Sequence, residues 1–166
     1  PTSTPEPGVP ENPAGENLLK NGDFSSGKDS WIEAVTAPGA ASISYEDKKA
    51  IFDITDVGTE EWNVQFKQEG ITLEKGSTYT VKFKATSTAD RTIKLAMMST
   101  DDKYTWYGGE DIALEAGKEK EVTVTFTMDK DTDTSAALFL SMGLIEGKDT
   151  PASKITLSDV SLVKAQ

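Results

Sequence analysis

Short runs of alternating apolar and polar residues dominate the chain from Asn17 onward. Apolar residues recur at every second position within 79–85, 93–97, 122–126 and 138–142, and a less regular run covers 51–54. A period of two is typical of strands that bury one face and keep the other in water. Residues that favour turns separate these runs at Gly58, 74–77, 89–90, 116–118 and 147–149.

No stretch of ten or more residues carries a 3.6-residue apolar stripe, so the pattern does not predict a helical domain. Eight to ten short strands in a single layer would leave their apolar faces in water. The sequence therefore predicts an all-β fold, an antiparallel β-sandwich of eight to ten strands, as in a jelly roll.

The last predicted strand changes phase. Ile155 and Leu157 place odd positions inside, whereas Val160 and Leu162 place even positions inside. One extra residue in a β-bulge near Asp159 would produce this slip. The Asp159 carboxylate would then either cap free backbone N–H groups or bind a cation.

Composition narrows the possible functions. The chain has 166 residues, enough for one domain with a tail, and 28 acidic against 17 basic residues give a net charge of −11. We therefore do not expect a nucleic-acid partner, since phosphate binding relies on Lys and Arg. The sequence contains neither Cys nor His, which excludes disulfides and thiolate or imidazole chemistry, so a metal site would need oxygen ligands. No apolar run predicts a membrane span, and no signal peptide pattern opens the chain, so we expect a soluble mature fragment.

The first sixteen residues differ from the rest. They hold five of the seven prolines and no aromatic residue. Such a segment buries too little apolar surface to order itself, and its prolines favour extended conformations. We predict an interdomain linker over 1–16 and one β-sandwich domain over 17–166.

Three motifs in order resemble the carbohydrate-binding modules of the family 4/9/16/22 group, which are β-jelly-roll domains. They are NLLKNGDF at 17–24 with Gly27 and Trp31, GITLEKGSTYTVKFKA at 70–85, and ITLSDVSL at 155–162. The linker is similar to those of secreted bacterial polysaccharide hydrolases. The resemblance thus implies a monomeric, extracellular module that binds a polysaccharide and is covalently linked to a catalytic domain.

The same resemblance implies a structural calcium ion where the first and last strands meet. Calcium accepts six to eight oxygen ligands, backbone carbonyls included. Carried over by position, Asp159 would supply a carboxylate, Asp23 a carbonyl, and Lys48 or a neighbour the carbonyl of a hairpin. Ser25 stands where the family often has Glu, so that ligand would be a serine hydroxyl or carbonyl.

A glycan site needs exposed aromatic rings beside polar side chains. In 60–67, the alternation of Val64 and Phe66 predicts that Asn63, Gln65 and Lys67 face away from the core, with Trp62 at the entrance of the strand. The resemblance assigns ring stacking to Trp62 and hydrogen bonding to Gln65. The alternative is that Trp62 packs at the edge of the sheet.

A second aromatic cluster spans 103–111, which we interpret as a loop after the strand that ends near Met97. It contains Tyr104, Trp106 and Tyr107, and we expect Trp106 and one tyrosine at the ligand, since exposed rings in loops mark binding surfaces. Phe139 and Ser141 would face the same side. Phe24 and Trp31 are expected in the core.

Catalysis is not expected. Glycoside hydrolysis needs two carboxylates, one of raised pKa, and the acidic pairs, such as Glu60 and Glu61, lie in polar turns. We predict a non-catalytic module that binds internal stretches of a β-linked polysaccharide in a groove and targets an attached hydrolase. β-Glucan is favoured because few charged groups face the groove, and xylan and mannan are retained. The alternatives are a structural β-sandwich spacer without a ligand and, less favoured, a hydrolase that uses Glu60 or Glu61.

Overall fold

The computed structural model describes residues 17–101 and 103–165. The predicted linker, 1–16, lies outside these residues. Within the described part the structure is all-β, with ten strands, one 3₁₀ turn (η1) and no α-helix. The elements are β1 (Ile32–Val35), β2 (Ala40–Glu46), β3 (Lys49–Asp56), η1 (Glu61–Asn63), β4 (Val64–Leu73), β5 (Thr78–Ser87), β6 (Arg91–Met98), β7 (Trp106–Leu114), β8 (Lys120–Thr127), β9 (Asp133–Ser141) and β10 (Lys154–Lys164).

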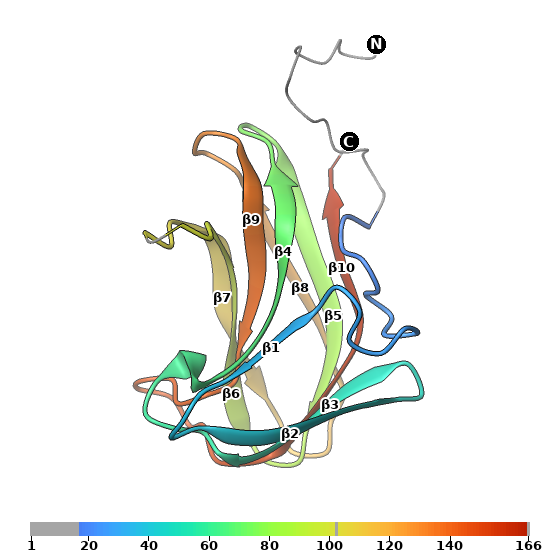
Figure 1. The fold of residues 1–166 in the computed structure, drawn as a ribbon, viewed down its shortest axis with the longest axis vertical. Helices are drawn as coiled ribbons and strands as arrows, with labels where there is room; N and C mark the ends of the chain where they lie inside the picture. Colours follow the sequence, from blue (N-terminus) through green and yellow to red (C-terminus); the bar gives the residue numbers. More distant parts are fainter. Residues whose placement is uncertain (1–16, 102, 166) are drawn as a thin grey trace.

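The strands form two five-stranded antiparallel sheets packed face to face (Figure 1). One sheet has the order β1-β4-β9-β6-β7 and the other β2-β3-β10-β5-β8. The alternating apolar residues of both sheets point inward and form one core. The predicted β-sandwich of the jelly-roll type is confirmed. One local prediction is wrong, because 106–114, expected in part as a loop, is the edge strand β7.

Aromatic residues close one end of the core. The Trp31 ring stacks on Phe66 with centroids 4.6 Å apart, and Phe24 lies 5.4 Å from Trp31. The indole N–H of Trp31 donates to the backbone carbonyl of Asn21 at 2.9 Å, so its polar atom is satisfied inside the fold. The structural roles expected for Phe24 and Trp31 are confirmed.

The predicted bulge in the last strand is present. The pairing of β10 with β5 shifts register between Ser158 and Ser161, and Asp159 adopts a positive φ of 50°. Just after it, the Val160 N–H donates to the carbonyl of Gly22 at 2.9 Å. A Cβ at Gly22 would lie 2.0 Å from the Val160 carbonyl oxygen, so this contact between the first segment and β10 requires glycine.

Candidate functional site

The register of the β1-β4-β9-β6-β7 sheet places outward side chains in rows. One row is polar and crosses all five strands: Ala34, Gln65, Ser141, Lys94 and Asp111. The next row is largely apolar: Ile32, Lys67, Phe139, Ala96 and Gly109. A third contains Ala137, Met98 and Trp106. This face therefore offers an apolar floor beside a line of hydrogen-bonding groups.

A groove of about 730 Å³ lies on this face. It is lined by side chains of the three rows together with η1 and the 99–105 loop: Ala34, Thr36, Glu61, Trp62, Gln65, Lys67, Lys94, Ala96, Met98, Tyr104, Trp106, Phe139 and Ser141. Its size falls within the range of sites that enclose small organic ligands. Four of the six predicted binding residues line it, namely Trp62, Gln65, Tyr104 and Trp106.

The rings of the groove divide into a floor and a rim. Phe139 is only 2% exposed and packs with Ala96 and Ala137. By contrast, Trp62, Tyr104 and Trp106 are 52%, 57% and 46% exposed. Several exposed rings gathered around one groove are typical of a ligand-binding surface.

Trp62 owes its position to the buried amide of Asn63. The Asn63 Oδ1 accepts hydrogen bonds from the backbone N–H groups of Thr59 and Glu60 at 2.9 and 2.8 Å, and its Nδ2 donates to Thr36 Oγ1 at 3.0 Å. Asn63 is 5% exposed. The prediction that Asn63 faces the ligand is therefore corrected, because the chain enters β4 through a 3₁₀ turn that rotates this side chain inward.

Two further contacts hold η1 against the sheet. Gly143 donates its N–H to the Glu61 carbonyl at 3.1 Å, and a Cβ on Gly143 would lie 2.3 Å from the Glu60 carbonyl oxygen. The Glu61 carboxylate forms an ion pair with Lys94 at 2.7 Å. The turn that carries Trp62 is thus fastened to the segment just after β9 and to β6.

The opposite rim is a loop organised by Asp101. Its Oδ1 accepts a hydrogen bond from the Ser99 hydroxyl at 2.7 Å and from the Lys103 N–H at 3.1 Å. The Ser99 hydroxyl in turn accepts from the Thr105 N–H at 2.7 Å. These bonds, with the one from Ser99 first, hold the pKa of Asp101 below its usual value. The loop is therefore closed on itself beneath Tyr104.

Tyr107 does not belong to the groove. It follows Trp106 in a strand, so its side chain lies on the opposite face, where it packs against the core and donates its hydroxyl to Asp133 Oδ2 at 2.7 Å. Burial and the bond to Asp133 raise the pKa of Tyr107 to about 12. This predicted binding residue is corrected to a structural one.

The polar groups of the groove are already paired with one another. Gln65 Nε2 donates to Ser141 Oγ at 3.3 Å, Lys67 pairs with Glu69 at 3.4 Å, and the Lys67 ammonium lies 5.6 Å from the Phe139 ring centroid. These pairs are neutral or charge-balanced, which suits sugar hydroxyls that both donate and accept. The sequence analysis missed Lys94, although the alternation of 93–97 already places it on the outward face.

The predicted calcium ligands lie on segments that meet. Val160, next to Asp159, bonds to Gly22, next to Asp23, and the Lys48 charge acts on the Asp23 carboxylate. Asp23 Oδ1 accepts the Ser25 N–H at 3.1 Å, and this bond is the main cause that lowers the pKa of Asp23. The Asp159 carboxylate lies 3.6 Å from the Lys84 ammonium. Among the described residues, no three acidic side chains are arranged so that they could hold a metal ion together, so a calcium ion here would depend largely on carbonyl oxygens.

No helix among the described residues is both long and apolar enough to cross a bilayer.

Comparison with known proteins gives a consistent result. A family model described as a carbohydrate binding domain matches residues 16–154. A solved CBM4 structure is 26% identical, with 90% of this chain and 95% of that one covered and a TM-score of 0.73. The N-terminal cellulose-binding domain of Cellulomonas fimi β-1,4-glucanase C is 22% identical over 94% and 99% of the two chains, with a TM-score of 0.65. TmCBM61, solved with β-1,4-galactotriose, is 15% identical over 90% and 99%, with a TM-score of 0.59. None of the curated proteins matches the chain.

Proposed function

The chain belongs to the family 4/9 carbohydrate-binding domains, and on that premise we propose that its groove holds an internal stretch of a β-linked, uncharged polysaccharide. A β-glucan is the favoured ligand, with xylan or mannan next. The observation that carries this proposal is the set of three half-exposed rings, Trp62, Tyr104 and Trp106, around an apolar floor.

The chemistry of the groove supports a sugar ligand. Pyranose rings present C–H faces that pack on aromatic side chains, and equatorial hydroxyls that need both donors and acceptors. The two rims supply the rings, and Gln65, Ser141 and the Glu61–Lys94 pair supply donors and acceptors. β-Glucan is favoured because the C. fimi domain that shares this fold is named a cellulose-binding domain.

The role of binding is to keep an attached hydrolase near its substrate. Tethering through a flexible linker replaces a bimolecular encounter with an intramolecular one, which raises the effective substrate concentration. We expect a dissociation constant on the order of tens of micromolar, or about −6 kcal/mol, because stacking contacts must offset the ordering of a flexible glycan. The proposed location is extracellular, where such polymers occur, and the proposed module is a monomer.

A structural calcium ion near Asp23, Lys48 and Asp159 is part of the proposal. Its support is that the three segments meet and that Asp159 occupies a bulge with positive φ. The ion would tie the first segment to β10, remote from the groove. We assign it no role in ligand contact.

Affinity electrophoresis tests the function. The wild-type domain is run through gels that contain β-1,4-glucan, mixed-linkage β-glucan, xylan or mannan, beside the double variant Trp62→Ala/Trp106→Ala. We expect retardation of the wild type in at least one gel and loss of it in the variant. A wild-type domain that none of these polysaccharides retards would instead support the ligand-free spacer. Release of reducing sugar from any of these polymers would contradict a non-catalytic module and implicate Glu60 or Glu61.

A further inference from the structure

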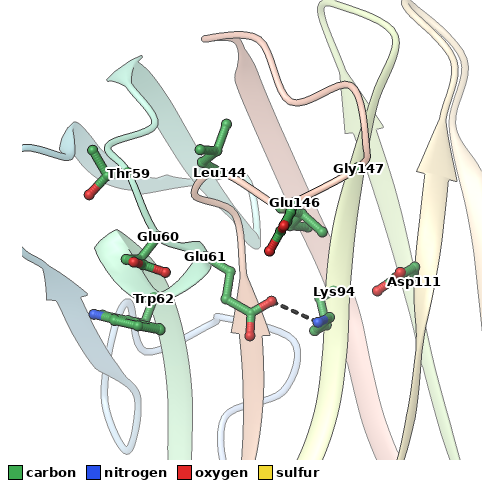
Figure 2. Close-up of a pocket in the computed structure, with 10 residues that line it drawn as sticks. Thr59, Glu60, Glu61, Trp62, Lys94, Asp111, Leu144, Glu146 and Gly147 are labelled. Carbon is green, nitrogen blue, oxygen red and sulfur yellow. Dashed lines mark ion pairs between the residues drawn. The ribbon is translucent and has the colours of Figure 1, made fainter.

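A second hollow adjoins the groove. It lies between η1 and the segment that leads from β9 towards β10, and it encloses about 600 Å³. In Figure 2, Glu60 and Trp62 lie on one side of the hollow with Leu144 above them, Glu146 lies near the centre, and Lys94 and Asp111 lie on the strands at the right of the view. The predicted binding residues of the sequence analysis do not account for this hollow, apart from Trp62.

The hollow lies next to the groove, since Glu61, Trp62 and Lys94 line both. The Glu61–Lys94 ion pair therefore lies at the boundary between the two spaces, with Trp62 beside it. A polysaccharide has no end within the groove when it binds by an internal stretch. A chain that passes Trp62 and the ion pair would enter the hollow directly.

The walls of the hollow suit a sugar and differ from the groove in charge. Leu144 is 40% exposed and adds an apolar side chain to the lining that Trp62 shares. Four carboxylates line the hollow against one ammonium group: Glu60, Glu61, Asp111 and Glu146 against Lys94. The groove itself has two lysines and one carboxylate among its lining residues. Ionised carboxylates accept strong hydrogen bonds from hydroxyl groups and repel other carboxylates.

The hollow is held open by the fold. The buried guanidinium of Arg91 donates from Nη2 to the carbonyls of Met142 and Gly143 at 2.8 and 3.2 Å, and from Nη1 to Pro151 at 3.3 Å. The segment between these anchor points carries Leu144 and Glu146. A ligand would therefore meet a wall that is largely preorganised, which reduces the ordering cost of binding.

We propose that this hollow is a second compartment of the binding site, which takes the next hydroxyl-bearing, uncharged units of the bound polysaccharide and excludes units that carry a carboxylate. The inference rests on the proposed function. It adds a longer ligand footprint and a selectivity against acidic polysaccharides.

Isothermal titration calorimetry tests the footprint. The probes are cello-oligosaccharides from trimer to hexamer or, if xylan alone retards the domain in electrophoresis, the matching xylo-oligosaccharides. We expect wild-type affinity to rise from trimer to hexamer. Leu144→Ala should bind the hexamer about threefold to tenfold more weakly through lost apolar contact, and the trimer equally well. Ile51→Ala, which removes a partly exposed aliphatic side chain from the other sheet, should leave both affinities unchanged.

Glu146→Gln tests the selectivity. It should raise the ratio of the affinity for a glucuronic acid-bearing oligosaccharide to the affinity for its uncharged counterpart. Leu144 and Glu146 are exposed, so both variants should fold, and thermal melts check this.

Wild-type affinity that does not rise with length, or an equal loss for trimer and hexamer in Leu144→Ala, would overturn the second compartment while leaving the groove as the binding site. An unchanged discrimination in Glu146→Gln would overturn the selectivity. Absence of wild-type binding to every probe and polysaccharide would instead overturn the proposed function itself.

Discussion

Replacement of Asn63 by Ala should reduce both stability and glycan affinity. The change removes three hydrogen bonds, two of which satisfy the N–H groups of Thr59 and Glu60 and one of which reaches Thr36. At about 1 kcal/mol for each bond, the free energy of unfolding should fall by about 3 kcal/mol. For a domain of this size the melting temperature should then fall by roughly 6–12 °C.

The expected loss of affinity has an indirect cause. Asn63 is buried and does not line the groove, so its removal acts through the turn that positions Trp62. Asn63→Asp keeps the oxygen that accepts from Thr59 and Glu60 but loses the donor to Thr36. It should therefore recover part of the stability and part of the affinity.

Calorimetric melts measure the stability. Calorimetric titration with an oligosaccharide of the polysaccharide that retards the domain in electrophoresis measures the affinity. Trp62→Ala is the matched comparison, because its half-exposed ring should contribute to binding and little to stability. An Asn63→Ala variant as stable as the wild type, or one that binds normally despite a clear loss of stability, would refute the view that this amide holds the rim in place.

Four other outcomes are expected. Trp106→Ala should weaken binding about tenfold, since a ligand that covers part of its exposed ring buries on the order of 50 Å²; titration calorimetry that finds no change would contradict its place on the rim. Arg91→Met should lower the free energy of unfolding by about 2–4 kcal/mol, measured in urea, because four carbonyl groups lose their donor. Tyr107→Phe should leave affinity unchanged. The pKa of Tyr107 is raised from 10 to about 12, so the tyrosine hydroxyl should stabilise the wild type relative to the Phe variant below pH 10, and this difference should disappear as the pH rises to 12. Thermal melts of both proteins across that pH range measure it. Calcium should raise the melting temperature of the wild type above its value in chelator, and Asp159→Ala should abolish the difference. Identical melting temperatures of the wild type in both buffers would contradict the proposed calcium site.

The sandwich was predictable because its strands obey a local rule. Within 79–85 of β5 and 122–126 of β8, every second residue is apolar and every one of these is buried in the core. Burial of one face decides the phase of such a strand. The bulge at Asp159 was predictable for the same reason, since an extra residue leaves a visible break in the alternation. The same alternation puts Gln65 and Phe139 on the groove face, where both lie.

The alternation of apolar and polar residues failed as a guide just before β4 begins. Counting back by two from the outward Gln65 places Asn63 outside, but residues 61–63 form a 3₁₀ turn, which the Asn63 amide stabilises by satisfying backbone groups of 59 and 60. That stabilisation depends on Thr36, which is distant in sequence. β7 was missed for a related reason. Its Gly108 suggests a loop, but a Cβ there would lie 2.6 Å from Phe126, so the glycine serves a contact between two sheets that no local pattern reveals.

The two rims of the groove are built in a similar way, and this bears on function. The rings most exposed to a ligand are carried by η1 and by the loop and strand start at 104–106, and each support depends on one polar side chain, Asn63 or Asp101. The sandwich beneath needs neither rim to bury its core. Substitutions in the rims can therefore change which sugar binds, at little cost in stability, as long as these two supports remain. Asp101→Ala tests this view. It should weaken binding through Tyr104 but lower the melting temperature much less than Asn63→Ala does, because Asp101 is exposed and water can replace its carboxylate as a hydrogen-bond acceptor. A loss of stability as large as that of Asn63→Ala would show that this rim and the sandwich are energetically coupled.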